Sequence, residues 1–233
     1  MSKFKLIITT LTMCIGSVWA GDLEDGNAAL QREDYVTALK KYKSAAEKND
    51  VKAQTMLGVI YGTDGYGVKK NYAEAARWYK LAALQGDGAA QYNLGFMYDN
   101  GQGVLQDNAE AVRWYKLAAA QGLSNAQNNL GSMYANGQGI AQDYAEAARW
   151  YKLAAAQGSV GAQVNLGLSY ANGQGILQDN IRAHMWFNLA AVNGDENAIK
   201  YRKIIVEEMT PQQIAQAQIL ARECQARNFK KCD

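Results

Sequence analysis

Few side chains in this sequence of 233 residues could do chemistry, and their spacing does not form a catalytic pattern. The chain has one histidine, His184, and a row of carboxylates, Glu74, Glu110 and Glu146, that recur every 36 residues. A catalytic or metal site needs several such groups to converge. Each glutamate is a whole repeat away from the next, and the sequence has no Ser-x-x-Lys nucleophile motif. The sequence therefore predicts a protein that is not an enzyme and that uses no cofactor or metal.

The first twenty residues are typical of an export signal. Lys3 and Lys5 precede an apolar run over residues 6–18, and small residues fit a cleavage site after Ala20. The run is too short to span a membrane. Two alternatives are a lipoprotein modified at Cys14, which a bulky residue precedes, and an uncleaved anchor. We predict cleavage, and hence a periplasmic or secreted protein without a membrane span.

Loss of the signal makes the formal charge neutral. The full chain has 24 Lys and Arg against 22 Asp and Glu, and removing Lys3 and Lys5 leaves 22 of each sign. A neutral chain has little long-range attraction for nucleic acids or for anionic membrane surfaces. The sequence therefore predicts no nucleic-acid partner.

Two cysteines, Cys224 and Cys232, remain near the C-terminus, eight residues apart. In an exported chain such a pair favours a disulfide that closes a short loop. Zinc is the alternative ligand, but two thiolates without a nearby histidine do not complete its tetrahedral site. We therefore predict a bridge between these two cysteines.

Four copies of one cassette organise most of the chain. Three positions recur every 36 residues, at Trp78, Trp114, Trp150 and Trp186, at Gly67, Gly103, Gly139 and Gly175, and at Gly86, Gly122, Gly158 and Gly194. Such a period is the signature of stacked units that bury their apolar faces only against their neighbours. With one proline in the chain, most of it can be helical. We predict an all-α fold, a right-handed α-solenoid of helix-turn-helix repeats with helical caps at both ends.

Each cassette predicts two helices joined by a glycine-rich loop. In the third copy, Ala126, Leu130 and Tyr134 fall on one stripe of the first helix. Gly131 interrupts this helix, so we expect that its missing side chain lets a neighbouring helix approach closely. Gly137 can adopt the left-handed conformation that ends the helix. No strand precedes the loop and no Lys-Ser or Lys-Thr follows it, which argues against a phosphate-binding loop.

The second helix of the third copy opens at a capping signal. Asp143 and Glu146 have the spacing of a capping box, and Ala147 and Tyr151 begin a stripe that we expect to be buried. Trp150 lies beside that stripe. A row of four tryptophans could form a platform for carbohydrate, but alanine neighbours at helical spacing favour packing in the core.

The repeat boundaries define the predicted domain organisation. A solenoid needs an end unit with one polar face at each end. We predict a signal peptide at 1–20, an N-terminal capping helix pair at 21–49, repeats at 50–86, 87–122, 123–158 and 159–194, and C-terminal capping helices with a disulfide-closed tail at 195–233. In the C-terminal cap, Thr210 and Gln213 form a capping box around Pro211.

The complete motif reads Ala-x-x-x-Leu-Gly-x-x-Tyr, then Asn-Gly-x-Gly, then Asp-x-x-x-Ala-x-x-Trp-Tyr-x-x-Ala-Ala-x-x-Gly. This pattern resembles the Sel-one-like repeat, a relative of the tetratricopeptide repeat. The resemblance implies an α-solenoid used as an adaptor or scaffold in signalling, envelope and host-contact assemblies, and it implies a non-enzymatic protein. One cysteine-rich exported branch has been linked to binding or hydrolysing penicillin-like molecules, but the four repeats here contain no cysteine. An envelope enzyme acting on penicillin-like or peptidoglycan substrates is the alternative to the scaffold.

Two rows of amides are the candidate partner contacts. In tetratricopeptide-like stacks the first helices line the concave face, which receives an extended or helical peptide. The rows on these helices are Asn93, Asn129 and Asn165, and Gln91, Gln127 and Gln163. Amides offer both donors and acceptors to a peptide backbone, but they could instead bond carbonyl groups of the adjacent loops. We predict a monomer with a protein or peptide partner, a purely structural spacer being the third possibility.

Overall fold

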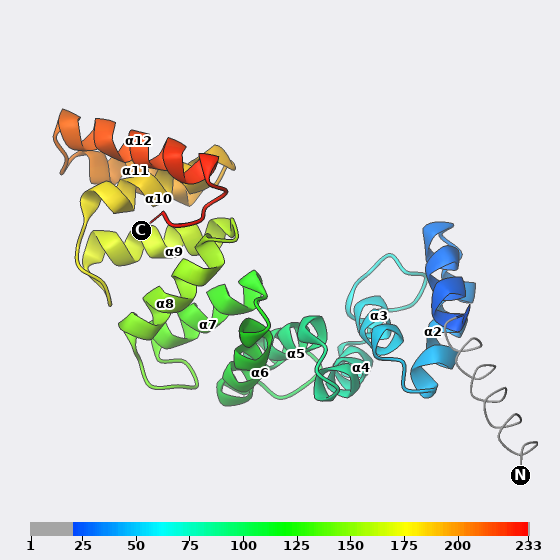
Figure 1. The fold of residues 1–233 in the computed structure, drawn as a ribbon. Coiled ribbons are helices and arrows are strands. Elements are labelled where there is room, and N and C mark those ends of the chain that lie inside the picture. The colour runs from blue at the N-terminus through cyan, green and yellow to red at the C-terminus, as the bar shows by residue number, and fades with distance from the viewer. Residues whose placement is uncertain (1–20, 233) are drawn as a thin grey trace, which may run out of the picture. The chain divides into compact units, whose positions relative to one another are not determined.

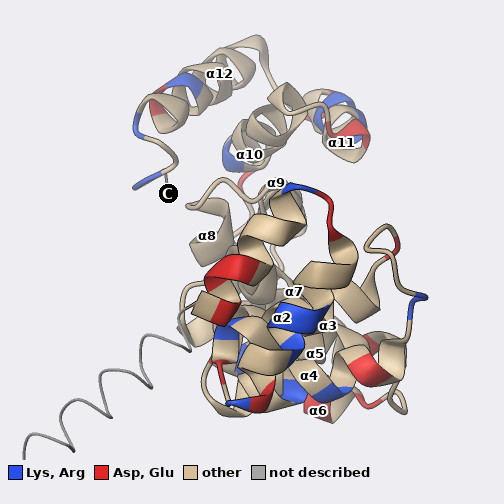
Figure 2. Ribbon diagram, turned by 90° about the vertical axis from the view of Figure 1, so that its right-hand side faces the viewer, with Lys and Arg blue, Asp and Glu red and all other residues tan. Residues whose placement is uncertain are grey.

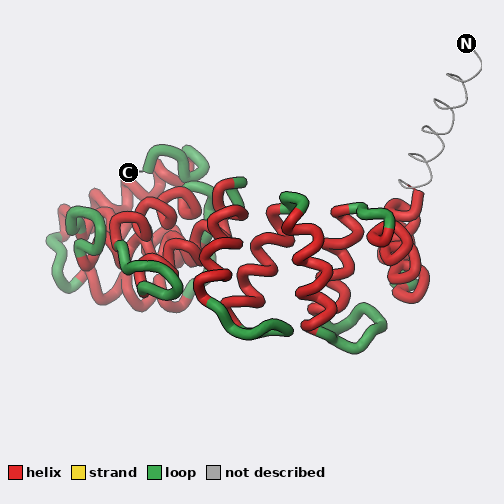
Figure 3. Tube along the Cα trace, turned by 90° about the horizontal axis from the view of Figure 1, so that it is seen from below, coloured by secondary structure: helices red, strands yellow, loops and turns green. Residues whose placement is uncertain are grey.

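The computed structural model describes residues 21–232. Within that range every regular element is a helix and no strand is present, as predicted for an all-α fold (Figure 3). The predicted signal peptide lies outside the described residues. Among those described, no helix is both long enough and apolar enough to cross a membrane.

The chain divides into two compact units, Met1–Asp107 and Asn108–Asp233 (Figure 1). The first contains a helix that runs to residue 31, then α2 (Tyr35–Glu47), α3 (Val51–Gly62), α4 (Tyr72–Leu84) and α5 (Gly88–Asn100). The second contains α6 (Asn108–Ala120), α7 (Ser124–Asn136), α8 (Tyr144–Ala155), α9 (Val160–Asn172), α10 (Asn180–Val192), α11 (Glu196–Val206) and α12 (Pro211–Ala226). Within each unit, helices that follow one another from α2 to α11 pack together, and α12 packs on α10.

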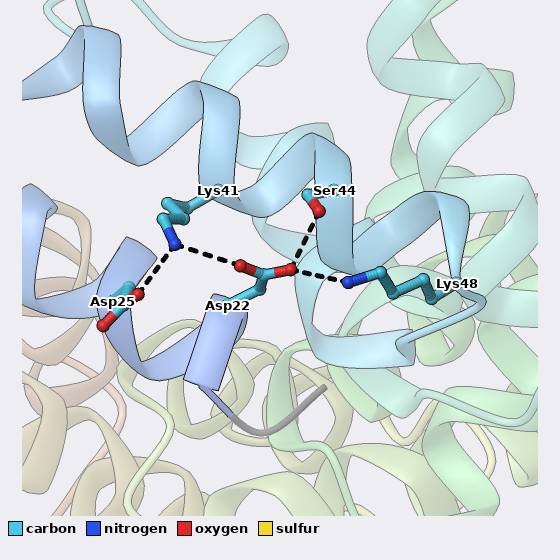
Figure 4. Close-up of polar contacts among 5 residues, drawn as sticks. All are labelled: Asp22, Asp25, Lys41, Ser44 and Lys48. Carbon is cyan, nitrogen blue, oxygen red and sulfur yellow. Dashed lines mark hydrogen bonds and ion pairs between the residues drawn. The ribbon is translucent and has the colours of Figure 1, made fainter. Parts of the chain in front are cut away.

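A network of ion pairs joins the two helices at the N-terminal end (Figure 4). The Asp22 carboxylate accepts hydrogen bonds from Lys48 Nζ at 2.7 Å, Ser44 Oγ at 2.8 Å and Lys41 Nζ at 3.1 Å. Lys41 Nζ also donates to Asp25 at 2.8 Å. Lys48, Ser44 and Lys41 hold the pKa of Asp22 well below its usual range, because their hydrogen bonds favour the charged form. The network fastens the first helix to α2.

The stripes predicted from the cassette form the core. Ala126 and Leu130 are fully buried, and Tyr151 is 5% exposed. Trp78, Trp114 and Trp186 are buried as well, which confirms core packing over an exposed platform for these rings. Trp150 is half-buried, with the Arg149 guanidinium 4.2 Å from its ring centroid.

The glycine inside three of the first helices marks a close approach by an aromatic ring. A Cβ built on Gly131 would lie 2.7 Å from Tyr151 Cε1, and a Cβ on Gly167 would lie 2.5 Å from Phe187 Cε1. Gly58 meets Tyr79 in the same way at 2.5 Å. Real Cβ atoms do not tolerate such distances, so these positions need glycine for packing. The expectation that the missing side chain admits a neighbouring helix is confirmed.

The glycine-rich loops also use glycine for two purposes. Gly137 ends α7 with φ of 65°, and Gly139 follows with φ of 68°, both in the left-handed region. A Cβ on Gly139 would collide with the backbone of Asn108, the first residue of α6. Gly175 lies against Tyr144, the first residue of α8, in the same manner. Each loop therefore rests on the start of the second helix of the preceding repeat.

The helix caps follow the predicted residues with one difference. Asp143 caps α8 by accepting from the backbone N–H groups of Ala145 and Glu146. Glu146 pairs with Arg149 at 2.8 Å, so its role is an ion pair one turn along the helix and the predicted box is only half formed. At α12 both halves of the Thr210–Gln213 capping box are present, as predicted.

Candidate functional site

Three hollows lie between neighbouring first helices. The α3–α5 groove, of about 160 Å³, belongs to the first unit and is lined by Gly62, Thr63, Tyr72, Tyr79, Asn93, Phe96, Met97 and Gln102. The α7–α9 groove, of about 240 Å³, belongs to the second unit and is lined by Ser132, Ala135, Asn136, Tyr144, Ala147, Tyr151, Asn165, Leu168, Ser169 and Gln174. The α9–α11 groove, of about 550 Å³, is lined by Leu168, Ala171, Asn172, Gln178, Phe187, Tyr201, Ile204, Ile205 and Glu208.

The three grooves are built from equivalent positions of the repeat. An aromatic ring of the second helix forms the floor, and it is Tyr79, Tyr151 or Phe187. The two flanking first helices form the walls. These rings are the same ones that pack against the helix glycines, so the glycine that admits the ring also shapes the groove. The repeat thus produces one kind of hollow several times over.

The α7–α9 groove is polar. Tyr151 Oη donates to Ser132 Oγ at 3.2 Å across its floor. Asn165 Nδ2 donates to Asn128 Oδ1 at 3.0 Å, and the Ser169 hydroxyl donates to the Asn165 carbonyl at 2.9 Å. Burial raises the pKa of the Tyr151 hydroxyl, which keeps it protonated at neutral pH. The groove therefore presents hydroxyl and amide groups of both hydrogen-bonding senses.

The α9–α11 groove is less polar than the α7–α9 groove and exposes about as much apolar as polar surface. Ile204 and Ile205 of α11 stand opposite Leu168 of α9. The rings of Phe187 and Tyr201 lie 5.6 Å apart, tilted by 36°. Ile204 is 50% exposed, so part of this apolar surface faces solvent. Glu208 at the rim supplies a carboxylate, which accepts a hydrogen bond from Asn180 Nδ2 at 3.2 Å.

The asparagine row lies on these first helices, and its members are half-buried. Asn93 lines the α3–α5 groove and Asn165 lines the α7–α9 groove. Asn129 Nδ2 donates to Tyr115 Oη at 3.2 Å. The donors of Asn129 and Asn165 thus reach side chains and not the loop carbonyls that the structural alternative proposed. The row remains our candidate for contact with a partner.

The glutamine row occupies a different environment from the asparagine row. Gln91 and Gln127 are about 5% exposed or less, and Gln163 is fully buried. Gln91 Nε2 donates to the Ala83 carbonyl at 3.1 Å, and Gln127 Nε2 donates to the Ala119 carbonyl at 3.2 Å. These carbonyls end the preceding second helix, where they lack partners within the helix. The glutamines therefore bind one repeat to the next.

A second amide completes this link in the first and third repeats, among others of the described chain. Gln157 Nε2 donates to Gln127 Oε1 at 2.8 Å, and Gln85 Nε2 donates to Gln54 Oε1 at 2.8 Å. In the last repeat the equivalent residue is Asn193, one methylene shorter, and its Nδ2 donates to the Leu189 carbonyl instead. Both side-chain polar atoms of Gln163 lack a hydrogen-bond partner within residues 21–232.

Several residues of the grooves and loops were not singled out from the sequence. The loops are held by Gln106, Gln142 and Gln178, whose Nε2 atoms donate to the carbonyls of Asp99, Ala135 and Ala171 at 2.8, 2.8 and 2.9 Å. The groove walls add Phe96, Leu168 and Ile204. Both sets recur at multiples of 36 residues. Their period was therefore visible, but it did not show which face of the helix each residue occupies.

The cysteine pair and the single histidine lie outside the three grooves. Cys224 and Cys232 form the predicted disulfide, with their Cα atoms 5.1 Å apart. His184 is 3% exposed on α10. No cluster of three or more His, Cys, Asp or Glu side chains suited to a metal ion occurs among residues 21–232.

Comparison with known proteins agrees with this architecture. The family model described as Sel1 repeat matches four consecutive segments, residues 51–87, 88–123, 124–159 and 160–195. Among solved structures, c5321, a protective antigen of uropathogenic Escherichia coli with an SLR fold, is 34% identical, with a TM-score of 0.78 over 84% of this chain. The chain spans 42% of the length of that protein. No curated protein matches the chain.

A Sel1 repeat protein from Oxalobacter formigenes is also similar. It is 31% identical, with a TM-score of 0.68, over 87% of this chain and 75% of its own. The repeat matches cover more than half of the chain and coincide with its helix pairs. The chain is therefore an α-solenoid protein that belongs to the Sel1 repeat family.

Proposed function

We propose that this protein is a non-catalytic scaffold of the bacterial envelope that binds a protein or peptide partner in its first-helix grooves. Sel1 repeat proteins generally act as protein-interaction scaffolds and are generally non-catalytic. The observation that carries the proposal is the recurrence of one groove at equivalent positions, with an aromatic floor and walls from two first helices. A periodic set of hollows suits a periodic ligand such as a polypeptide, whose side chains follow one another at fixed intervals.

The chemistry of the grooves suits such a ligand. The half-buried Asn93 and Asn165 offer amide donors and acceptors, which pair with backbone N–H and C=O groups. The exposed part of Ile204 and the rings of the α9–α11 groove offer apolar surface for a side chain. We expect polar groups of the partner in the α7–α9 groove and an apolar side chain in the α9–α11 groove.

Three observations support an envelope location. The disulfide between Cys224 and Cys232 is typical of an oxidising compartment. The N-terminal residues are predicted to form a cleaved signal peptide. The similar E. coli protein is a protective antigen. We propose that the protein is a periplasmic or secreted monomer. Light scattering can test the monomer by measuring the molar mass of the protein in solution.

Selection of peptides on the immobilised protein tests the binding role. Peptides chosen from a random library should bind the wild-type chain and lose at least tenfold in affinity to a variant carrying Asn165→Ala and Ile204→Ala. The control is Leu153→Ala, because Leu153 is 43% exposed on a second helix and lines none of the three grooves. Equal loss in the control, or no loss in the double variant, would exclude the grooves as the binding face.

The non-catalytic part of the proposal has a separate test. Incubation with a chromogenic β-lactam should give no turnover above that of the buffer. Hydrolysis at enzyme-like rates would favour the alternative of an envelope enzyme acting on penicillin-like substrates.

A further inference from the structure

Near the C-terminal end of the chain, two core positions of the cassette carry basic side chains. His184 stands where the third repeat has Ala148, and Arg202 stands where the fourth has Leu166. Ala148 is 3% exposed and Leu166 is fully buried, so both are ordinary core positions in the earlier repeats. A histidine and an arginine at such positions are costly to bury unless they have partners.

The two side chains meet in one hollow of about 430 Å³ between α10, α11 and α12. Its lining includes His184 and Asn188 from α10, Arg202 and Val206 from α11, and Ile214 from α12. None of these residues lines a first-helix groove. The hollow is therefore a separate site, and it lies where α12 packs on α10.

The positive charge in this hollow is not balanced by the protein. Arg202 Nη1 donates to the neutral Asn188 Oδ1 at 2.6 Å. Within residues 21–232 neither Arg202 nor its neighbour Lys203 takes part in an ion pair. Figure 2 shows that α11 carries basic and acidic residues, yet no acidic residue lines the hollow.

His184 gives a second indication of a missing partner. The side chain is 3% exposed and lines the hollow, and its Nδ1 atom has no hydrogen-bond partner in the part of the chain that the structure describes. Burial and the nearby Arg202 lower the pKa of His184, so the imidazole is neutral at pH 7. A buried polar side chain without a partner is unusual and points to a ligand.

We propose that this hollow binds a carboxylate that carries a small apolar group. The planar guanidinium of Arg202 is suited to two parallel hydrogen bonds with a carboxylate, and Lys203 adds positive charge beside it. Val206 and Ile214 provide the apolar surface for the rest of the ligand. A free aliphatic acid and the C-terminal carboxylate of a peptide that ends in an apolar residue share this chemistry.

Calorimetric titration of the oxidised, exported protein tests the site with defined probes. N-acetyl-leucine should bind, and N-acetyl-leucinamide, which lacks the negative charge, should bind at least tenfold more weakly. The tripeptide Ala-Ala-Leu separates the two sources of the carboxylate. Tighter binding of the tripeptide than of N-acetyl-leucine assigns the site to a peptide terminus, and equal binding assigns it to a free acid.

Two variants decide whether Arg202 makes the contact. Arg202→Leu restores the residue found at Leu166, so the core should fold, and affinity for the acid should fall at least tenfold. Arg222→Leu removes the same charge from an exposed position on α12 and should leave the affinity unchanged. Equal binding of the acid and the amide, an undiminished affinity of Arg202→Leu, equal losses in both variants, or no binding of either acid at millimolar concentration would overturn the proposal.

Discussion

The α7–α9 and α9–α11 grooves have the same position in the repeat, but the α7–α9 groove is the more polar of the two. Tyr151 forms the floor of one and Phe187 that of the other, and Asn165 of the first becomes Tyr201 in the second. The helix glycines behind both floors are retained, as Gly131 and Gly167. The comparison teaches that the repeat separates two tasks. Small residues keep the helices in contact, and the residues on the groove face are free to set what the groove accepts.

The same contrast extends into the core. Ala148 of the third repeat is replaced by His184 in the fourth, and Leu166 of the fourth repeat is replaced by Arg202 in α11, while the helices keep their order. Basic side chains thus replace apolar ones at these two positions, and α12 packs on α10 beside them. Substitutions at equivalent positions of the repeat can show which of these replacements the fold merely tolerates and which contribute to its stability or to binding.

The largest expected effect separates Leu130 from Arg202, which occupy equivalent positions. Leu130→Ala should lower the free energy of unfolding by about 2–5 kcal/mol, because it leaves a cavity in a fully buried stripe. Arg202→Leu should be neutral or stabilising, because it replaces a partly buried charge with an apolar side chain. Urea denaturation of each variant measures both. Similar losses of unfolding free energy in the two variants would mean that the packing of α10, α11 and α12 depends on Arg202.

The next pair tests the contacts beneath the two grooves. Gly131→Ala and Gly167→Ala should each destabilise the fold by about 1–3 kcal/mol, because the new Cβ would overlap Tyr151 or Phe187. The rings must then move, so each variant should also lose affinity in its own groove. Thermal unfolding, compared with the exposed substitution Lys200→Ala on α11, measures the effect on stability. An unchanged midpoint in either glycine variant would show that its ring has room to shift.

Exchanging Gln and Asn at the ends of the third and fourth repeats should change the free energy of unfolding by about 1 kcal/mol. Gln157→Asn should destabilise the third repeat, since the shorter side chain no longer reaches Gln127 Oε1. Asn193→Gln should stabilise the fourth, since it offers a donor to the unpartnered Gln163. Opposite shifts of the urea midpoint are expected. Shifts in the same direction would contradict the role assigned to this amide link.

The smallest expected effect is a dependence on pH that arises from His184. Its pKa is lowered in the folded state by burial and by Arg202, so the unfolded chain binds the proton more readily. Its contribution to stability is therefore constant above the unfolded value of 6.5 and decreases as the pH falls below that value. His184→Ala, which restores the residue at Ala148, should flatten the stability profile between pH 7 and pH 5. If the stability of His184→Ala depends on pH as steeply as that of the wild type, a group other than His184 binds the proton.

The sequence predicted the repeated part of the fold because each signal there was local and periodic. The stripe of Leu130, the helix stop at Gly137 and the disulfide at Cys224 all follow from residue type and spacing. The grooves could not be predicted in the same way. Gln127 and Asn129 are two residues apart in one helix with the same period, yet one is buried and the other half-buried. Only the position of the neighbouring helix decides which amide has surface left for a partner.

The position of the loop glycines has a consequence for how the chain is made. Gly139 rests on the start of α6 and Gly175 on the start of α8, so each second helix begins beneath a loop that belongs to the next repeat. Since synthesis proceeds from the N-terminus, a repeat leaves the ribosome or the export channel before the residues that cover it. In the last repeat no such loop follows, and Asn180 at the start of α10 is contacted instead by Glu208, just beyond α11. If a nascent chain stops between repeats, the second helix of its last repeat therefore stays uncovered. In this chain the covering role falls to the residues after α11.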